Sequence, residues 1–155
     1  MVWMVGLTGA KFGMKPRGIE LDPNRPATPG LEVQTADALT VDWGSPDLIV
    51  TNPPYVLAME FVLRGVAEAK RGATVAMLLR LAFLASLSRA AFHGSHPADV
   101  FVLAKRPSFT GGQTDSTDYA WFVWGPGRGG RWNVLLPRFP RELELPGMGR
   151  ESDVP

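Results

Sequence analysis

The tetrapeptide Asn52-Pro53-Pro54-Tyr55 combines residue types that can hold a planar amine for reaction with an electrophile. Two successive prolines fix the backbone and remove two N–H donors, so the turn is rigid and its carbonyl groups are expected to be free acceptors. The side-chain carbonyl of Asn52 and the main-chain carbonyl of Pro53 can then accept both protons of an exocyclic amino group. Such a contact would aim the nitrogen lone pair at the electrophile, while Tyr55 offers a flat face to the ring that carries the amine.

A predicted strand and a predicted helix flank this tetrapeptide. The strand is the apolar run 47–51, and the helix extends toward Gly72, a plausible stop. The apolar positions at helical spacing are Met59, Val62, Leu63 and Val66, and the positions on the opposite side are Glu60, Arg64 and Glu68. This pattern indicates an amphipathic helix that packs on a sheet.

The rest of the chain alternates between strand and helix or loop patterns. Further strands are predicted at 18–21, 31–35, 73–79, 99–103, 119–124 and 132–136, and a second helix is predicted at 81–92. The segment 73–79 is typical of a parallel strand covered on both faces, and the strands 119–124 and 132–136 are expected to be neighbours across a Gly-rich turn. The alternation predicts an α/β fold with a mostly parallel sheet and ligand-binding loops at the carboxyl ends of its strands.

Three polar side chains lie at such strand ends. They are Glu20, Asp37 and Asn52. An acidic residue that closes an early strand of such a sheet can bind the two hydroxyl groups of a cofactor ribose. Each acid taken alone is equally compatible with a helix cap or a solvated loop residue.

Composition excludes several other chemistries. The chain has 155 residues and no cysteine, which excludes disulfides, thiolate zinc clusters and a cysteine nucleophile. No metal is expected, because His93 and His96 fit a polar loop better than a ligand pair. The net charge of +1 gives no global sign of a nucleic-acid binder, so any such contact would need local patches. Candidate patches are Lys105-Arg106 and the group Arg128, Arg131, Arg138 and Arg141, which could equally be solvated surface residues. The absence of a long apolar run and of a signal peptide predicts a cytoplasmic protein without membrane contact.

The tetrapeptide resembles the catalytic motif of S-adenosylmethionine-dependent amino-methyltransferases, Asp/Asn/Ser-Pro-Pro-aromatic, and matches it at all four positions. Longer segments are similar to adenine-specific DNA methyltransferases of the phage and prophage type, namely 52–61, 78–84, 106–111 and 117–124. The resemblance spans 17–124 and implies a Rossmann-like class I methyltransferase sheet with S-adenosylmethionine as cofactor. It also implies transfer of a methyl group to the exocyclic amino group of adenine in DNA, with the target base flipped out of the duplex.

The resemblance further implies roles for individual residues. Asn52, Pro53, Pro54 and Tyr55 would form the catalytic turn. Glu20 would hold the cofactor ribose, and Asp37 would hold the amino group of its adenine. The flipped target base would lie between Tyr55 and Phe109.

The N-terminal part departs from the family. The usual Gly-rich turn and the helix after it are not intact, and Gly6 and Gly9 are expected to be a shortened remnant of the cofactor motif, because the distance to Glu20 is too short for a full helix. We therefore expect a catalytic domain over 1–137 with an incomplete N-terminus, followed by a loose tail over 138–155.

Other functions share the same amine-binding geometry. The alternatives are methylation of an RNA base or of a protein glutamine, and a truncated or inactive domain that keeps the fold as a binding module. Because the chain shows no separate target-recognition domain, base specificity would come from loops at 24–30 or 110–117, or from a partner.

Overall fold

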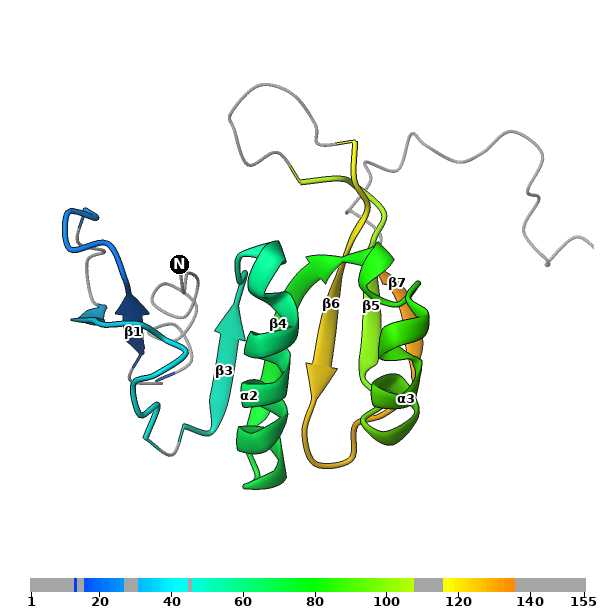
Figure 1. The fold of residues 1–155 in the computed structure, drawn as a ribbon, viewed down its shortest axis with the longest axis horizontal. Helices are drawn as coiled ribbons and strands as arrows, with labels where there is room; N and C mark the ends of the chain where they lie inside the picture. Colours follow the sequence, from blue (N-terminus) through cyan, green and yellow to red (C-terminus); the bar gives the residue numbers. More distant parts are fainter. Residues whose placement is uncertain (1–12, 14–15, 27–30, 45, 108–115, 136–155) are drawn as a thin grey trace, which may run out of the picture.

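The computed structural model describes residues 13, 16–26, 31–44, 46–107 and 116–135, which form two sheets and the helices beside them (Figure 1). The smaller sheet pairs β1 (Arg17–Glu20) with β2 (Glu32–Thr35) in parallel. The larger sheet has the order β3-β4-β6-β5-β7. Its strands are β3 (Leu48–Thr51), β4 (Thr74–Arg80), β5 (Asp99–Leu103), β6 (Tyr119–Trp124) and β7 (Trp132–Leu135). The predicted strands are therefore present, with small shifts at their ends.

The larger sheet is mixed, so the expectation of a mostly parallel sheet was wrong. β3 pairs in parallel with β4, and β5 with β7, but β6 is antiparallel to both of its neighbours. Strand β6 follows β5 and pairs directly with it, with Val102 opposite Ala120. A strand that pairs with its predecessor without a crossover must reverse direction.

The last two strands are not neighbours, which corrects a second expectation. β6 lies between β4 and β5, so both of its hydrogen-bonding edges are occupied. The chain after β6 therefore continues to the free edge of β5, where Phe101 pairs with Asn133 of β7. The buried carboxylate of Asp99 holds this connection, because it accepts hydrogen bonds from the main-chain N–H groups of Gly129 and Arg131.

Two α-helices cover the sheet. The 3₁₀ turn η1 (Tyr55–Leu57) leads directly into α2 (Ala58–Lys70), as the helical spacing predicts. The single helix expected at 81–92 is instead a 3₁₀ turn, η2 (Leu81–Phe83), followed by α3 (Leu87–Ser95). Ser86 between them has extended backbone angles, and the carbonyl of Phe83 accepts from the Nε of Arg89 at 2.8 Å and lies 3.2 Å from Nε2 of His93.

The two histidines do not form the expected polar loop. His93 lies within α3, and His96 is the residue that ends this helix. The His93 ring meets Phe83 edge-on, with 5.4 Å between ring centres, and His96 stacks on Phe92. His93 therefore contacts aromatic rings of η2 and α3, while His96 stacks on a ring of the helix that it ends.

Helix α2 approaches β4 closely through Gly65. A Cβ atom at this position would lie 2.5 Å from Cε of Met77 and 2.9 Å from Cγ1 of Val75. The buried side of the helix is rotated from the predicted one, because Leu63 is 52 % exposed and Glu68 is only 6 % exposed. Glu68 tolerates burial because Arg71 pairs with its carboxylate at 3.1 Å.

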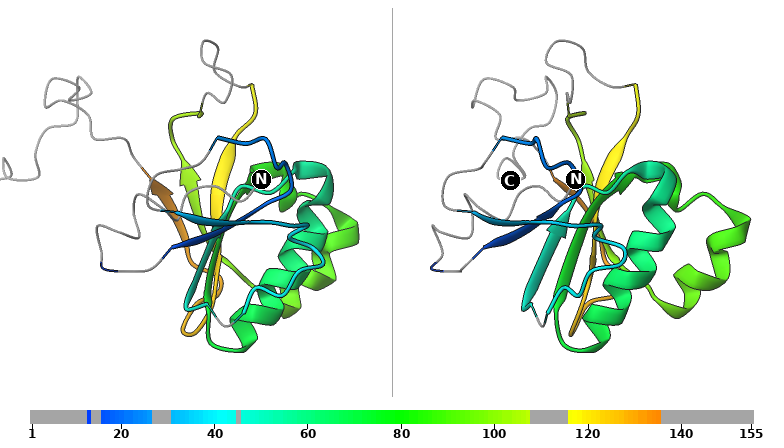
Figure 2. Two further views of the ribbon diagram at one scale, coloured as in Figure 1. Left: turned by 90° about the vertical axis from the view of Figure 1, so that its left-hand side faces the viewer. Right: turned by 60° about the vertical axis from the view of Figure 1, so that its left-hand side comes forward.

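Both α-helices lie on the same side of the larger sheet (Figure 2). Within the described ranges no helix covers the opposite face. Leu78 and Leu79, which are adjacent on β4 and point to opposite faces, are nevertheless both buried. The small β1–β2 sheet lies beyond the β3 edge and crosses the direction of the larger sheet (Figure 2). No helix of the described part of the chain is long and apolar enough to span a membrane.

Candidate functional site

Asn52 leaves the carboxyl end of β3 with an unsatisfied acceptor. Its side-chain Oδ1 is buried and accepts no hydrogen bond from the described residues. The hydroxyl of Thr51, the residue before it, is likewise buried and unpaired within the described part. A buried acceptor without a donor costs about 1–3 kcal/mol, so the side-chain carbonyl of Asn52 favours a ligand that brings an N–H group.

The two prolines behave differently in the turn. Pro53 is fully buried and Pro54 is exposed, with φ −56° and ψ 128°. The carbonyl of Pro54 accepts from the N–H of Leu57 at 2.9 Å, so it is not the free acceptor that the sequence led us to expect. The carbonyl of Pro53 accepts from no described residue and therefore keeps the capacity assigned to it.

Tyr55 is held between two other side chains. Its ring centre lies 5.6 Å from that of Tyr119, at an interplanar angle of 40°, and the guanidinium carbon of Arg80 lies over its ring at 4.7 Å. Burial raises the pKa of the Tyr55 phenol well above its ordinary value, and a side-chain hydrogen bond with Tyr119 adds to this effect, while a weaker one with Asn52 opposes it. Tyr55 is therefore a neutral, fixed aromatic group, and one face of its ring already contacts a cation.

Arg80 and Tyr119 reach this place because of the sheet register. They are directly opposite each other on β4 and β6, at the carboxyl end of β4. The N–H of Leu81 donates to the carbonyl of Asp118 at 2.8 Å, which fixes the end of β4 against the start of β6. Sequence reasoning missed both residues, although Arg80 is a charged residue that ends an otherwise apolar strand.

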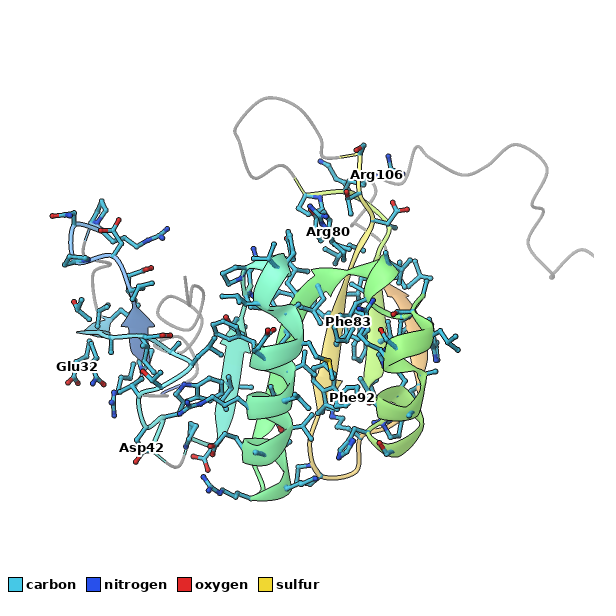
Figure 3. The ribbon with its side chains drawn as sticks, viewed as in Figure 1. Glu32, Asp42, Arg80, Phe83, Phe92 and Arg106 are labelled. Carbon is cyan, nitrogen blue, oxygen red and sulfur yellow. The ribbon has the colours of Figure 1, made fainter. Side chains whose placement is uncertain are left out.

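The connection from β5 to β6 begins and ends at this same edge of the sheet. The Nε of Arg106 donates to Asp118 at 2.7 Å, and this ion pair joins the two ends of the connection. Figure 3 shows Arg80 and Arg106 at this end of the sheet. Phe109, the second predicted aromatic contact, follows Arg106 in the sequence and lies outside the described residues.

Glu20 is buried at the end of β1 and is already paired. It is 8 % exposed, and its two oxygens accept from the N–H of Asp22 at 3.1 Å and from Arg25 at 3.2 Å. Each carboxylate oxygen has a second lone pair, so Glu20 keeps acceptor capacity for a hydroxyl group. Its burial and its partners fix the position of the carboxylate.

Asp37 is exposed, and one of its oxygens is occupied. Oδ1 accepts from the N–H of Leu39 at 2.8 Å, and within the described residues Oδ2 has no partner. A free, exposed carboxylate oxygen can accept from an amino group, so Asp37 fits the role implied for it. Gly6 and Gly9, the other predicted cofactor contacts, lie outside the described residues.

Arg64 connects the Asp37 segment to α2. Its guanidinium donates to the carbonyls of Leu39 and Val41 and lies 4.7 Å from the ring centre of Trp43. The sequence pattern placed Arg64 on the polar side of the helix, but the side chain is half-buried and structural. The spacing of residues along a helix does not predict such contacts, because Leu39 and Val41 are 25 and 23 residues away from Arg64 in the sequence.

The candidate basic patches are largely paired. Arg128 and Arg131 both bind the buried Asp99, at 3.5 and 2.8 Å. The hydrogen bond from Arg131 holds the pKa of Asp99 well below its usual range, against the opposing effect of burial. These two arginines therefore stabilise the connection between β6 and β7. Arg138 and Arg141 lie outside the described residues. The described residues also contain no group of three acidic, histidine or cysteine side chains suited to a metal ion.

No family model matches the chain, and no curated protein matches its sequence. Among solved structures, the fold is similar to that of a predicted O-methyltransferase from Agrobacterium tumefaciens, with a TM-score of 0.40 and 20 % identity. The similarity covers 68 % of this chain and 51 % of that protein, so the chain matches about half the length of this neighbour.

Proposed function

We propose that the chain transfers a methyl group from S-adenosylmethionine to the exocyclic amino group of adenine in DNA. The observation that carries this proposal is the buried, unpaired Oδ1 of Asn52 beside Tyr55 at the carboxyl end of β3. An amino group with two N–H donors would supply the hydrogen bond that Asn52 Oδ1 lacks. The Tyr55 ring lies beside this acceptor, where it can stack on the aromatic ring that carries the amino group.

The chain's part in the reaction is to hold and orient the amine. Asn52 Oδ1 and the Pro53 carbonyl would accept hydrogen bonds from its two N–H groups. With both N–H groups directed at these acceptors, the nitrogen lone pair would point away from them and toward the methyl donor. The neutral phenol of Tyr55 places no charge near the methyl donor, since its pKa is raised. The methyl transfer then needs no covalent bond to the protein, which agrees with a site that lacks cysteine.

The cofactor would supply an electrophilic methyl group on a sulfonium centre. The residues described fit its ribose and adenine in part. Asp37 offers a free carboxylate oxygen, and Glu20 offers a fixed carboxylate with capacity for one more donor. Both acids stand at the carboxyl ends of parallel strands or just after them, as expected for a nucleoside site.

The direct test is incorporation of labelled methyl groups into DNA by the wild-type chain and by Asn52→Ala. We expect the variant to lose about 100-fold or more in kcat, because it removes an acceptor that the reacting amine uses, while the affinity for S-adenosylmethionine stays similar. The matched control is Thr51→Val, which removes the neighbouring buried hydroxyl and should keep most of the activity.

The same assay separates the alternatives. RNA and a glutamine-containing release-factor substrate are offered in parallel with duplex and single-stranded DNA. Labelling of RNA or protein but not DNA would transfer the proposal to that substrate. Cofactor binding without any labelling would identify an inactive binding module, and unchanged turnover in Asn52→Ala would remove Asn52 from the mechanism.

A further inference from the structure

We infer that Arg80 is a positioning residue that binds a phosphate group of the substrate strand next to the base held at Tyr55. This inference rests on the proposed function and makes it more specific. It identifies the substrate as a phosphate-bearing nucleic acid rather than a neutral glutamine side chain. It also assigns a role to a residue outside the Asn-Pro-Pro-Tyr turn.

Arg80 is an exposed cation without a described acidic partner. Its side chain is exposed at the carboxyl end of β4, although the strand before it is apolar and buried. No described carboxylate forms a salt bridge with it, whereas Arg25, Arg71, Arg106, Arg128 and Arg131 all have acidic partners. Arg80 is therefore a cation at the site whose charge the described acids do not neutralise.

Tyr55 holds the guanidinium of Arg80 in place. The guanidinium carbon lies 4.7 Å from the ring centre, so the guanidinium is held against the ring by cation–π attraction. The guanidinium of Arg80 donates to no described residue, so its N–H groups remain available for an oxyanion. A planar fork of donors fits phosphate in a bidentate manner, which a lysine ammonium cannot reproduce.

Arg80 and Tyr55 are both held by neighbouring residues of the sheet. Tyr119, opposite Arg80 in the sheet, is fully buried and contacts Tyr55, and Leu81 is tied to Asp118 by a main-chain hydrogen bond. The cation and the aromatic ring thus form one unit with little freedom. A nucleotide carries its phosphate one sugar away from its base, so a base at Tyr55 brings a phosphate to the neighbourhood of Arg80. A glutamine side chain brings no anion there.

The test measures binding of a fluorescent single-stranded oligonucleotide, without cofactor, to the wild-type chain, Arg80→Met and Arg80→Lys. Arg80→Met should weaken binding about 10-fold, which corresponds to about 1.4 kcal/mol, because a charge-assisted contact with a phosphate is lost. The slope of log affinity against log salt should fall by about 0.7, the amount expected for one lost phosphate contact on a single strand. Arg80→Lys keeps the charge but loses the planar fork, so its affinity should lie between the two. Lys70→Met, which removes an exposed positive charge at the far end of α2, is the matched control and should bind like the wild-type chain.

A second readout locates the contact. Single neutral methylphosphonate linkages are placed one at a time along the oligonucleotide. One position near the target adenine should weaken binding to the wild-type chain but leave binding to Arg80→Met unchanged. In turnover assays, Arg80→Met should raise KM for DNA with little change in kcat, since the contact positions the strand equally in the bound state and the transition state.

Each outcome bears on a separate claim. Equal binding and equal salt slopes for the wild-type chain, Arg80→Met and Lys70→Met would overturn the role of Arg80 while leaving DNA methylation intact. Failure of the wild-type chain to bind or label any nucleic acid would overturn the proposed function and this inference together. Loss of kcat with unchanged KM would place Arg80 in the support of Tyr55 instead of at a phosphate.

Discussion

Arg64 of α2 lies over the indole ring of Trp43, with its guanidinium carbon 4.7 Å from the ring centre. The same side chain donates to the carbonyls of Leu39 and Val41. These contacts join the segment after β2, which carries Asp37, to the helix that follows the Asn-Pro-Pro-Tyr turn. One arginine thus fixes the proposed cofactor side of the site relative to the proposed catalytic side.

Replacing Arg64 should therefore damage cofactor binding from a distance. Arg64→Ala removes the cation–π contact and two charge-assisted hydrogen bonds, and we expect the free energy of unfolding to fall by about 2 kcal/mol. Affinity for S-adenosylmethionine should fall about 10-fold, because the Asp37 segment loses its anchor on α2. Urea unfolding and calorimetric titration measure the two effects. Lys70→Ala, in the last turn of the same helix, should change neither; an Arg64→Ala protein with intact cofactor affinity would show that the two segments are positioned independently.

Cofactor binding should depend directly on Asp37. Asp37→Ala removes the free oxygen proposed to hold the adenine amino group, so titration with S-adenosylmethionine should show at least a 10-fold loss of affinity. Asp22→Ala provides a control, since Asp22 is also an exposed acid whose side chain accepts a main-chain N–H two residues later. Similar affinities for the two variants would indicate that Asp37 only stabilises its own turn.

The elements of the fold were predictable because each one is a local pattern. The strand before Asn52, the helix after Tyr55 and the apolar strand at 74–80 each follow from residue spacing within a few positions. The break before α3 was not predictable in this way, because it depends on Arg89 reaching the carbonyl of Phe83 from six residues away. The spacing of apolar residues does not reveal a side-chain contact of this kind.

The order of the strands was not predictable from spacing. A Gly-rich turn favours a hairpin between β6 and β7, but β6 already has partners on both edges. Asp99 favours the position of β7 beside β5, because its buried carboxylate accepts hydrogen bonds from the segment that connects β6 to β7. At the site, the sequence pattern identified Asn52 and Tyr55, while Arg80 and Tyr119 join them only through the pairing of β4 with β6.

Asp99 should make the stability of the domain depend on pH. Its pKa is lowered in the folded state, chiefly by the Arg131 hydrogen bond, while in the unfolded chain an aspartate titrates near pH 4. The ionised form therefore stabilises the fold above about pH 4, and this contribution is lost as the pH falls from there toward the folded pKa. Urea unfolding between pH 7 and pH 3 should show that the stability of the wild-type protein falls more steeply than that of Asp99→Asn.

At pH 7 the free energy of unfolding of Asp99→Asn should already be lower by about 2 kcal/mol, because an amide replaces a carboxylate that accepts from two arginines. Parallel curves for the two proteins would assign the acid sensitivity to other carboxylates.

Tyr55 should contribute its ring to catalysis and not its ionisation. Burial raises its pKa above the ordinary value of about 10, so the phenol stays protonated across the range in which the enzyme is assayed. Tyr55→Phe keeps the ring and the Arg80 contact, and its kcat/KM profile between pH 6 and pH 9 should have the same shape as that of the wild-type chain. Its absolute value should drop only a few-fold, since one buried hydrogen bond with Tyr119 is lost.

Tyr55→Ala removes the support for both the target ring and the Arg80 guanidinium, so we expect kcat/KM to fall by about 100-fold. A pH profile that changes shape in Tyr55→Phe would instead identify the phenol as an acid or base in the reaction, in conflict with the environment that keeps it neutral.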